Sequence, residues 1–281
     1  MLSFNFNGKV VLITGGSRGI GKAIAKGFLG CGAAVALFAR DKDALQDAKD
    51  DLQVFGNIDS FSVDVSLYQS VVAAVDEVFR RFKTIDVLVN AAAIHGPVAF
   101  FPEANMDSWR QAVEVNLLGT AYMMREVLPI MMKKRVGKII NFSGGGASGP
   151  RRGLSAYAAS KTAVVRLTET VAEELRIKNI PIDINVIAPG MMKTRLTDEL
   201  VADSRSNVSD EEYKALLAIQ EKGFSPEKTV HLCLFLASEY SNGLTGKFLS
   251  TEWDNWLSIP KRLKEVMNSD MYTLRRIKKD S

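Results

Sequence analysis

The sequence predicts an α/β protein built as one doubly wound domain, in which helices cover both faces of a parallel β-sheet. Short apolar runs rich in β-branched residues alternate along the chain with segments of helical periodicity, which is typical of buried parallel strands joined by helices. With 281 residues and 47% hydrophobic content, the chain is long enough for one large core. Its first predicted strand, Val10–Ile13, leads directly into a glycine-rich turn and a helix.

Four glycines crowd the turn after this strand, at Gly15, Gly16, Gly19 and Gly21. Because glycine has no side chain, backbone N–H groups there can approach a pyrophosphate, and the N-terminus of the following helix adds partial positive charge. Ordinary turns and helix caps also use glycine, so the cluster alone indicates little. The strand before it and the helix after it supply the context that a dinucleotide-binding site requires.

Six further apolar runs predict the remaining strands of the sheet. They cover residues 33–40, 61–65, 85–90, 137–143, 182–188 and 244–250. The segments between them have helical periodicity, and the longest predicted helices cover residues 106–124 and 155–175. Neither an internal repeat nor a second glycine fingerprint occurs, which favours a single domain.

Tyr157 and Lys161 lie four residues apart in the second of these long helices, so both side chains leave the same helical face. A tyrosine with a pKa of about 10 exchanges protons poorly at neutral pH unless its phenolate is stabilised, which a neighbouring ammonium group can do. The same spacing also occurs on solvated helix faces. Asn116 lies within the apolar pattern of the other long helix, where it can equally be a hydrogen-bonded core residue.

Charge and composition count against several other functions. Residues 261–281 carry seven Lys or Arg and three Asp or Glu, so the net charge of +4 is confined to this tail, whereas a nucleic-acid site should spread over a folded face. Because no apolar run reaches membrane-spanning length and no signal-peptide pattern is seen, we expect a cytoplasmic protein without a membrane span. Cys31 and Cys233 are expected to be buried thiols, and no spacing of ligand residues indicates a metal site.

Six motifs, in order along residues 7–250, are similar to those of the short-chain dehydrogenase/reductase family. They are T-G-G-S-R-G-I-G at 14–21, the acid Asp64, N-A-A-A at 90–93, V-N-L-L-G at 115–119, Y-A-A-S-K at 157–161 and the P-G turn at 189–190. The resemblance implies a three-layer Rossmann domain over residues 1–250, with seven parallel strands in the order 3-2-1-4-5-6-7 and a substrate lid at 191–223. Ala93 departs from the family's usual glycine, and residues 251–281 form a C-terminal extension that the family pattern does not explain.

The same resemblance implies an oxidoreductase that interconverts a carbonyl and a secondary alcohol by hydride transfer with NADP(H). Tyr157 would be the acid/base, Lys161 would lower the pKa of Tyr157 and bind the cofactor ribose, and Asn116 would complete a proton relay. The residues implied to bind the cofactor are Gly15, Ser17, Arg18, Gly19, Ile20, Gly21, Arg40, Asp64, Val65, Asn90, Ala91, Tyr157, Lys161, Pro189, Gly190 and Thr194. The implied substrate is a small carbonyl or alcohol of unspecified class, and the implied assembly is a homodimer or homotetramer.

The end of the second strand bears on the choice between NADP and NAD. In the family's register, the acid that binds the ribose of NAD falls on Ala39, which cannot accept a hydrogen bond from ribose hydroxyls. Arg18 and Arg40 are suited to a 2′-phosphate, so we predict NADP. The alternative is that Asp41 binds the ribose, although its position also suits it to cap the following helix.

The family's catalytic serine lies thirteen residues before the tyrosine, and that position is Gly144 in this chain. Because loops accept insertions more readily than strands, one extra residue in the glycine-rich loop would bring Ser143 to the catalytic place. We therefore predict Ser143 as the catalytic serine, with Ser148 as the competitor. His95 lies where a substrate pocket would open, although a loop histidine is more often a surface residue.

Two other classes of function stay open. The altered serine loop leaves room for a non-catalytic NADP(H)-binding regulator or scaffold with the same fold. The basic tail leaves room for a protein that acts on nucleic acid or at a membrane surface. Within the extension, the apolar cluster Trp253, Trp256, Leu257 and Ile259 is predicted to pack back on the domain or on a neighbouring subunit.

Overall fold

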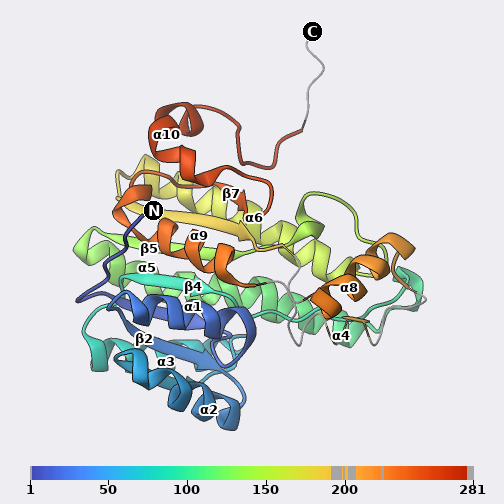
Figure 1. The fold of residues 1–281 in the computed structure, drawn as a ribbon, viewed down its shortest axis with the longest axis horizontal. Helices are drawn as coiled ribbons and strands as arrows, with labels where there is room; N and C mark the ends of the chain where they lie inside the picture. The colour runs from blue at the N-terminus through green and yellow to red at the C-terminus, as the bar shows by residue number, and fades with distance from the viewer. Residues whose placement is uncertain (1, 191–197, 199, 202–206, 223–224, 277–281) are drawn as a thin grey trace.

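The centre of the molecule is a sheet of seven parallel strands in the order β3-β2-β1-β4-β5-β6-β7 (Figure 1). The computed structural model describes residues 2–190, 198, 200, 201, 207–222 and 225–276. Its strands are β1 (Val10–Thr14), β2 (Ala34–Ala39), β3 (Ile58–Ser62), β4 (Val87–Asn90), β5 (Gly137–Phe142), β6 (Ile182–Ala188) and β7 (Phe248–Ser250). The predicted doubly wound fold and strand order are confirmed.

Helices join the strands and cover both faces of the sheet. They are α1 (Gly19–Gly30), α2 (Lys42–Leu52), α3 (Tyr68–Phe82), α4 (Met106–Val113), α5 (Gly119–Lys134), α6 (Ser155–Ile177), α8 (Asp210–Lys222), α9 (Glu227–Ala237) and α10 (Ile259–Met267). A π-helical turn, η3 (Glu114–Leu118), joins α4 to α5. The helix predicted over 106–124 is therefore continuous but widened around Asn116.

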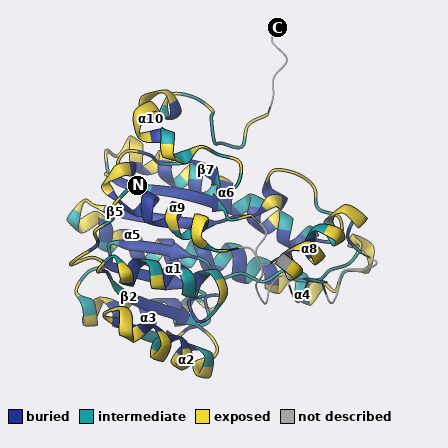
Figure 2. Cartoon of the chain, viewed as in Figure 1, coloured by how far each residue is buried: buried dark blue, intermediate teal, exposed yellow. Residues whose placement is uncertain are grey.

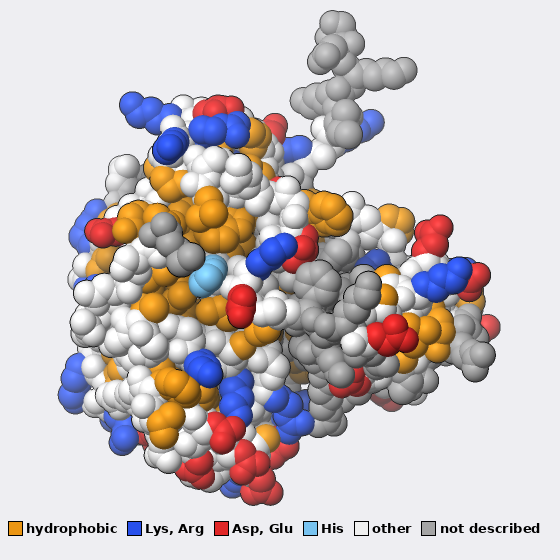
Figure 3. Space-filling view, in the orientation of Figure 1, with side chains coloured by type: hydrophobic (Ala, Val, Ile, Leu, Met, Phe, Trp, Pro, Cys, Tyr) orange, Lys and Arg blue, Asp and Glu red, His pale blue; other side chains and the backbone are white. Residues whose placement is uncertain are grey.

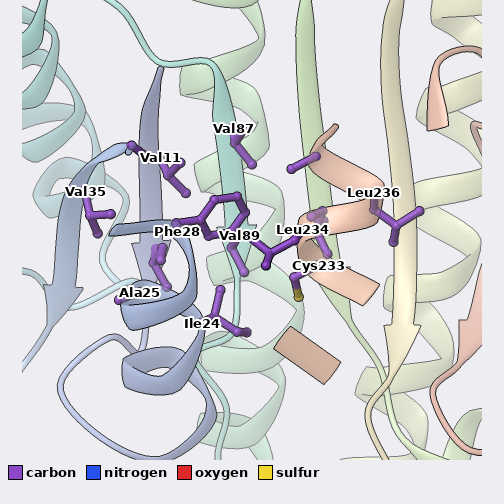
Figure 4. Packing of buried hydrophobic residues seen from close by; sticks show 14 of the residues in the cluster. Val11, Ile24, Ala25, Phe28, Val35, Val87, Val89, Cys233, Leu234 and Leu236 are labelled. Carbon is purple, nitrogen blue, oxygen red and sulfur yellow. The ribbon is translucent and has the colours of Figure 1, made fainter. Parts of the chain in front are cut away.

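Alternate residues of each strand pack into separate cores on the two faces of the sheet. Val11 of β1 belongs to a core with α1, α2 and α9, whereas its neighbour Leu12 belongs to a core with α3, α5 and α6. Figure 4 shows Phe28 of α1 and Cys233 of α9 in the first core, over β1 and β4. Because both faces are covered, the inner strands β1, β4 and β5 are buried along their length (Figure 2).

Two strand boundaries differ from the sequence prediction. The third strand is Ile58–Ser62 instead of residues 61–65, and the seventh is Phe248–Ser250 instead of residues 244–250. Val63 and Val65 are buried in the core although they lie beyond the end of β3. Their burial gives a loop the apolar pattern of a strand, which explains the displaced prediction.

The C-terminal extension packs on the domain and shares its core. Ile259 and Val266 of α10 are each 1% exposed and belong to the same core as α1 and α9. The ring of Trp256 lies 5.3 Å from that of Phe235 between centroids. Trp253 is nevertheless 89% exposed, so only part of the predicted apolar cluster is buried.

A second part of the extension covers the outer edge of β7. The backbone N–H of Phe248 donates to the carbonyl of Tyr272 at 2.7 Å. The buried ammonium group of Lys247 donates to the carbonyls of Ser269 and Met271, at 3.0 Å each. These bonds satisfy groups that an edge strand would otherwise leave open to another chain.

Of the two cysteines, only Cys233 is fully buried, and Cys31 at the end of α1 is half-buried. Burial raises the pKa of both thiols, so neither is activated. Among the described residues, no helix has the length and apolar character needed to cross a membrane.

Candidate active site

A cleft of about 640 Å³ opens at the carboxyl edge of the sheet, between the glycine loop and the ends of β1, β2 and β4. This volume is typical of a cofactor or small-molecule site. Its walls include the predicted cofactor residues Gly15, Ser17, Arg18, Gly19, Ile20, Gly21, Arg40, Asp64, Val65 and Ala91. They also include residues that were not among the predicted cofactor-binding residues, among them Phe38, Val63, Ala92, Ile94 and Val115.

The glycine loop is packed too closely for side chains at two of its positions. Gly15 has a φ of +67°, and a Cβ there would lie 2.9 Å from the backbone of Ala92. A Cβ at Gly21 would lie 2.3 Å from the carbonyl oxygen of Gly15. Because α1 begins at Gly19, its unbonded N–H groups lie beside this bare backbone at the cleft wall. This cradle fits the pyrophosphate of a dinucleotide.

Two arginines and one aspartate lie at the end of β2. An Nη atom of Arg18 lies 2.5 Å from the carboxylate of Asp41. The same carboxylate caps α2 by accepting a hydrogen bond from the backbone N–H of Ala44 at 3.1 Å. That hydrogen bond and the Arg18 charge lower the pKa of Asp41. Asp41 is thus the predicted helix cap, and its carboxylate is also tied to Arg18, whereas Arg40 has no ion pair within the described part of the chain.

Asp64 follows β3 and Asn90 is the last residue of β4, but only Asp64 lines the cleft. A carboxylate oxygen of Asp64 accepts hydrogen bonds from the backbone N–H of Ser66 at 2.9 Å and its hydroxyl at 2.6 Å. Asn90 lies below the cleft floor, where its amide donates to the side-chain oxygen of Asn141 at 2.8 Å. The side-chain oxygen of Asn90 is buried without a partner among the described groups. The structure therefore gives Asn90 a place in the sheet interior.

Tyr157 and Lys161 lie together on the buried face of α6, and neither is among the residues that line this cleft. Tyr157 is 8% and Lys161 1% exposed, and the ammonium nitrogen lies 5.9 Å from the centre of the phenol ring. The ammonium group donates to the carbonyl of Phe142, at the end of β5, at 2.9 Å. The predicted pair is therefore brought together at the carboxyl edge of the sheet.

Burial controls the protonation of this pair in the structure. It lowers the pKa of Lys161 to about 8 and raises the pKa of Tyr157. The charge that opposes the rise at Tyr157 is that of Arg151, whose guanidinium carbon lies 6.0 Å from the ring centre. The sequence did not single out Arg151, because nothing in the loop pattern shows that it turns toward Tyr157.

Asn116 lies in the π-helical turn and is fully buried. Its side-chain amide donates to the carbonyl of Ile94 at 2.9 Å and to the hydroxyl of Ser160 at 3.0 Å, and its side-chain oxygen accepts from the N–H of Ile94 at 2.9 Å. Its backbone carbonyl accepts from the hydroxyl of Thr120 at 2.8 Å. Asn116 therefore fixes the loop after β4 relative to α6, and its part in a proton relay stays a prediction.

The serine loop keeps the strict spacing of the family. A Cβ at Gly144 would lie 2.9 Å from the hydroxyl oxygen of Tyr157, so Gly144 is the residue that faces this hydroxyl. The Ser143 hydroxyl donates to the backbone carbonyl of Lys161 at 3.0 Å. The Ser148 hydroxyl is exposed and donates to the carbonyl of Gly145 at 3.1 Å. The structure does not bring the hydroxyl of either serine to Tyr157, and a catalytic role for Ser143 stays a prediction.

His95 lies directly beside Tyr157. The two ring centres are 5.0 Å apart, with the ring planes inclined by 53°. On other sides, Tyr157 shares a small buried apolar cluster with Leu154 and with Leu200 and Leu216 of the predicted lid. The sequence placed His95 near the mouth of the pocket, but only the fold shows that it contacts the tyrosine.

The turn after β6 lies at the carboxyl edge of the sheet, but the predicted cofactor residues Pro189 and Gly190 are not among those that line the cleft. Pro189 accepts a hydrogen bond from the hydroxyl of Thr229 at 3.3 Å. Gly190 has a φ of +71° and packs against Glu252 of the C-terminal extension. A Cβ added at Gly190 would lie 2.9 Å from Cγ of Glu252. The predicted contact Thr194 lies outside the described residues. No group of three or more His, Cys, Asp or Glu side chains in the described ranges is arranged to hold a metal ion.

Comparison with known proteins finds the family model for short chain dehydrogenases, which matches residues 9–205. The chain is 34% identical over 247 residues to 3-oxoacyl-[acyl-carrier-protein] reductase FabG of Thermotoga maritima, covering 87% of this chain and 96% of that protein. It is 35% identical over 238 residues to L-fucose dehydrogenase of Mus musculus, covering 83% of this chain and 84% of that protein. Among solved structures, NAD+-bound xylitol dehydrogenase superposes with a TM-score of 0.79 at 28% identity, covering 87% of this chain and 98% of the other.

Proposed function

Because this chain belongs to the short-chain dehydrogenase/reductase family of oxidoreductases, we propose that it interconverts a carbonyl and a secondary alcohol by hydride transfer with NADP(H). One observation carries the proposal. Tyr157 and Lys161 are buried side by side at the carboxyl edge of the sheet, where a cleft also opens whose glycine cradle fits a dinucleotide. A proton donor for the substrate oxygen and a site for a hydride carrier are thus provided within one fold.

In the reductive direction, the bound cofactor supplies a hydride to the carbonyl carbon. Tyr157 gives its hydroxyl proton to the carbonyl oxygen, and in the oxidative direction it takes that proton back. The charge of Arg151 opposes the rise in the pKa of Tyr157 that burial causes. The proposed role of Lys161 is to favour the tyrosinate further when its ammonium group is charged. Asn116 holds the loop after β4 in place and has the proposed role in the proton relay.

A preference for NADP(H) is supported by the charges at the adenosine end of the cleft. Arg40 lines the cleft directly after β2, and Arg18 lies across from it on the glycine loop. Guanidinium groups bind phosphate bidentately, which suits the 2′-phosphate that distinguishes NADP from NAD. Asp41 as the acceptor for an unphosphorylated ribose is the competing proposal, because it also lines the cleft.

The proposed substrate is a small carbonyl or alcohol compound. The relatives include a reductase of 3-oxoacyl groups carried by acyl carrier protein and a dehydrogenase of L-fucose. The similarity to relatives therefore favours neither an acyl nor a sugar substrate over the other. The apolar side chains Val98, Leu154, Leu200 and Leu216 around Tyr157 favour an apolar group next to the reacting carbonyl. A homodimer or homotetramer, located in the cytoplasm, stays a prediction.

Gly144 supports a second candidate, a non-catalytic NADP(H)-binding regulator or scaffold. Glycine at this position offers no side-chain donor to a substrate oxygen, as expected if catalysis had been lost. Action on nucleic acid through the basic tail has less support, because Lys and Arg are interspersed with Asp and Glu on the face drawn in Figure 3.

The test is NADPH oxidation with a panel of carbonyl compounds: an acetoacetyl thioester, a ketose, a steroid ketone and a cyclic diketone. We expect turnover of at least one of them by the wild type, and loss of that turnover in Tyr157→Phe because only the proton donor is removed. NADPH binding, measured by fluorescence, should be nearly unchanged in the variant. Binding without turnover of any compound would favour the regulator, and an active Tyr157→Phe would refute the acid/base assignment.

A further inference from the structure

The place beside Tyr157 that bears a serine in the family bears no hydrogen-bond donor in this chain. Gly144 faces the Tyr157 hydroxyl, and the hydroxyls of Ser143 and Ser148 donate to backbone carbonyls instead. Neither Gly144 nor these two serines therefore offers a second donor to a substrate oxygen that develops negative charge. Since such a donor contributes strongly to catalysis, the site is incomplete unless another residue supplies it.

His95 is a polar side chain that the structure places against Tyr157. The distance of 5.0 Å between ring centres puts the edge of the imidazole close to the phenol. Whichever tautomer it adopts, a neutral imidazole carries one N–H, and the cation carries two. His95 can therefore donate a hydrogen bond in either protonation state, as a serine hydroxyl can.

The backbone on both sides of His95 is held in place. Before it, the N–H and carbonyl of Ile94 are both bonded to the side chain of Asn116, at 2.9 Å each. After it, Gly96 has a φ of +74° and packs so closely that a Cβ would lie 2.8 Å from Cβ of Ala112 and 3.3 Å from Cβ of Ala156. Ala156 directly precedes Tyr157 on α6, so the histidine loop and the tyrosine are fixed to the same support.

We propose that His95 is a catalytic residue of this enzyme and replaces the missing serine as the hydrogen-bond donor to the reacting oxygen. The inference rests on the proposed carbonyl–alcohol chemistry. During reduction, the hydride adds to the carbonyl carbon, the C=O π electrons move to oxygen, and Tyr157 transfers its proton to that oxygen. The N–H of His95 donates a hydrogen bond to the same oxygen and keeps its proton. Preorganised donors of this kind stabilise the transition state because they need no rearrangement.

The experiment compares His95→Leu, which replaces the imidazole with an apolar side chain of similar size, with His95→Gln, which retains an N–H donor. The probe is whichever carbonyl of the panel the wild type reduces fastest, with NADPH at saturation. We expect kcat of His95→Leu to fall about a hundredfold or more and that of His95→Gln to stay within about tenfold of the wild type. The matched control is His231→Leu on the exposed side of α9, which should leave kcat unchanged.

NADPH affinity and melting temperature are measured for every variant, so that a folding defect is recognised. If His95→Leu binds NADPH as the wild type does and keeps most of its kcat, the proposal is refuted, and equal losses in the Leu and Gln variants refute a donor role. A hundredfold loss of kcat in Ser143→Ala, together with a small loss of kcat in His95→Leu, would identify Ser143 as the hydrogen-bond donor and refute the role of His95. In these cases an inactive Tyr157→Phe shows that the proposed chemistry still stands, whereas an active one refutes that chemistry and the inference with it.

Discussion

The choice between NADPH and NADH can be tested at Arg40 and Asp41, two adjacent residues of opposite charge that differ in their ion pairing. Arg40 has no ion pair among the described residues, whereas Asp41 is bound to Arg18 at 2.5 Å and also caps α2. We predict that Arg40→Asp inverts or abolishes the preference for NADPH over NADH. Asp41→Asn should strengthen that preference, because it removes a negative charge next to the proposed phosphate site while an asparagine still caps the helix.

The magnitudes differ because the two perturbations differ in kind. A charge-assisted hydrogen bond from Arg40 to a phosphate is worth about 1.5–3 kcal/mol. Since about 1.4 kcal/mol is a factor of ten, its loss should lower kcat/KM for NADPH about 10- to 150-fold. The Asp41 carboxylate is half-exposed, so its charge is screened by solvent. Its removal should change the ratio of the two kcat/KM values by no more than about fivefold.

The assay is the ratio of kcat/KM for NADPH to that for NADH, at one ionic strength. The control is Asp51→Asn, because Asp51 pairs with Lys22 of α1 at 2.5 Å but does not line the cleft. That variant should leave the ratio unchanged. A wild-type ratio near one, or a ratio that Arg40→Asp leaves unaltered, would refute the reasoning. A tenfold loss of kcat/KM for NADH in Asp41→Asn would identify Asp41 as the ribose acceptor.

Two further predictions concern stability. Burial holds the pKa of Lys161 at about 8 in the folded protein against a usual 10.5, so between these pH values the unfolded chain binds more protons. The free energy of unfolding of the wild type, relative to that of Lys161→Met, should therefore rise with pH above about 8 by up to about 1.4 kcal/mol per pH unit. Urea titrations of both proteins at several pH values measure this difference, and a difference that does not change with pH would contradict the prediction. Ile259→Ala should lower the free energy of unfolding by about 2–4 kcal/mol, because Ile259 is buried in the core. Trp253→Ala, at an exposed residue of the same extension, should lower it by less than about 0.5 kcal/mol. Similar losses in the two variants would show that α10 does not share the core.

The architecture was predictable because its signals are local and repeated. Inner strands covered on both faces read as apolar runs, and the glycine turn lies between a strand and a helix, which is the context that a dinucleotide site requires. What failed was the position of strand ends. Val63 and Val65 are buried beyond the end of β3, and burial gives a loop residue the same apolar signature as a strand residue. The backbone pairing that defines a strand leaves no comparable signature in the amino-acid sequence.

The glycine loop and the strand ends that line the cleft were predictable from their motifs. The catalytic pair was predictable because its two residues share one helix. The spacing of Tyr157 and Lys161 places them on a common face, and the fold adds only their burial. The serine could not be placed in this way, because its position depends on how the loop leaves β5. In the structure a Cβ at Gly146 would lie 2.9 Å from Cα of Ala158 on α6, so the loop is held against the helix from its start. Gly144 is the residue that faces the Tyr157 hydroxyl in the structure, and Ser143 donates to the carbonyl of Lys161, so Ser143 as the catalytic serine stays a prediction.

The C-terminal extension shows why a boundary drawn from family resemblance need not be a physical one. The resemblance ends at Ser250, yet the next residues continue into the candidate site. The N–H of Thr251 donates to the carbonyl of Ala188 at 3.0 Å, and Glu252 packs against Gly190 and pairs with Lys228 of α9 at 3.1 Å. The following α10 then contributes buried side chains to the core under α1 and α9. Because one segment shapes the turn at the end of β6 and also fills the core, changes in the extension that disturb its packing should alter the site as well as stability.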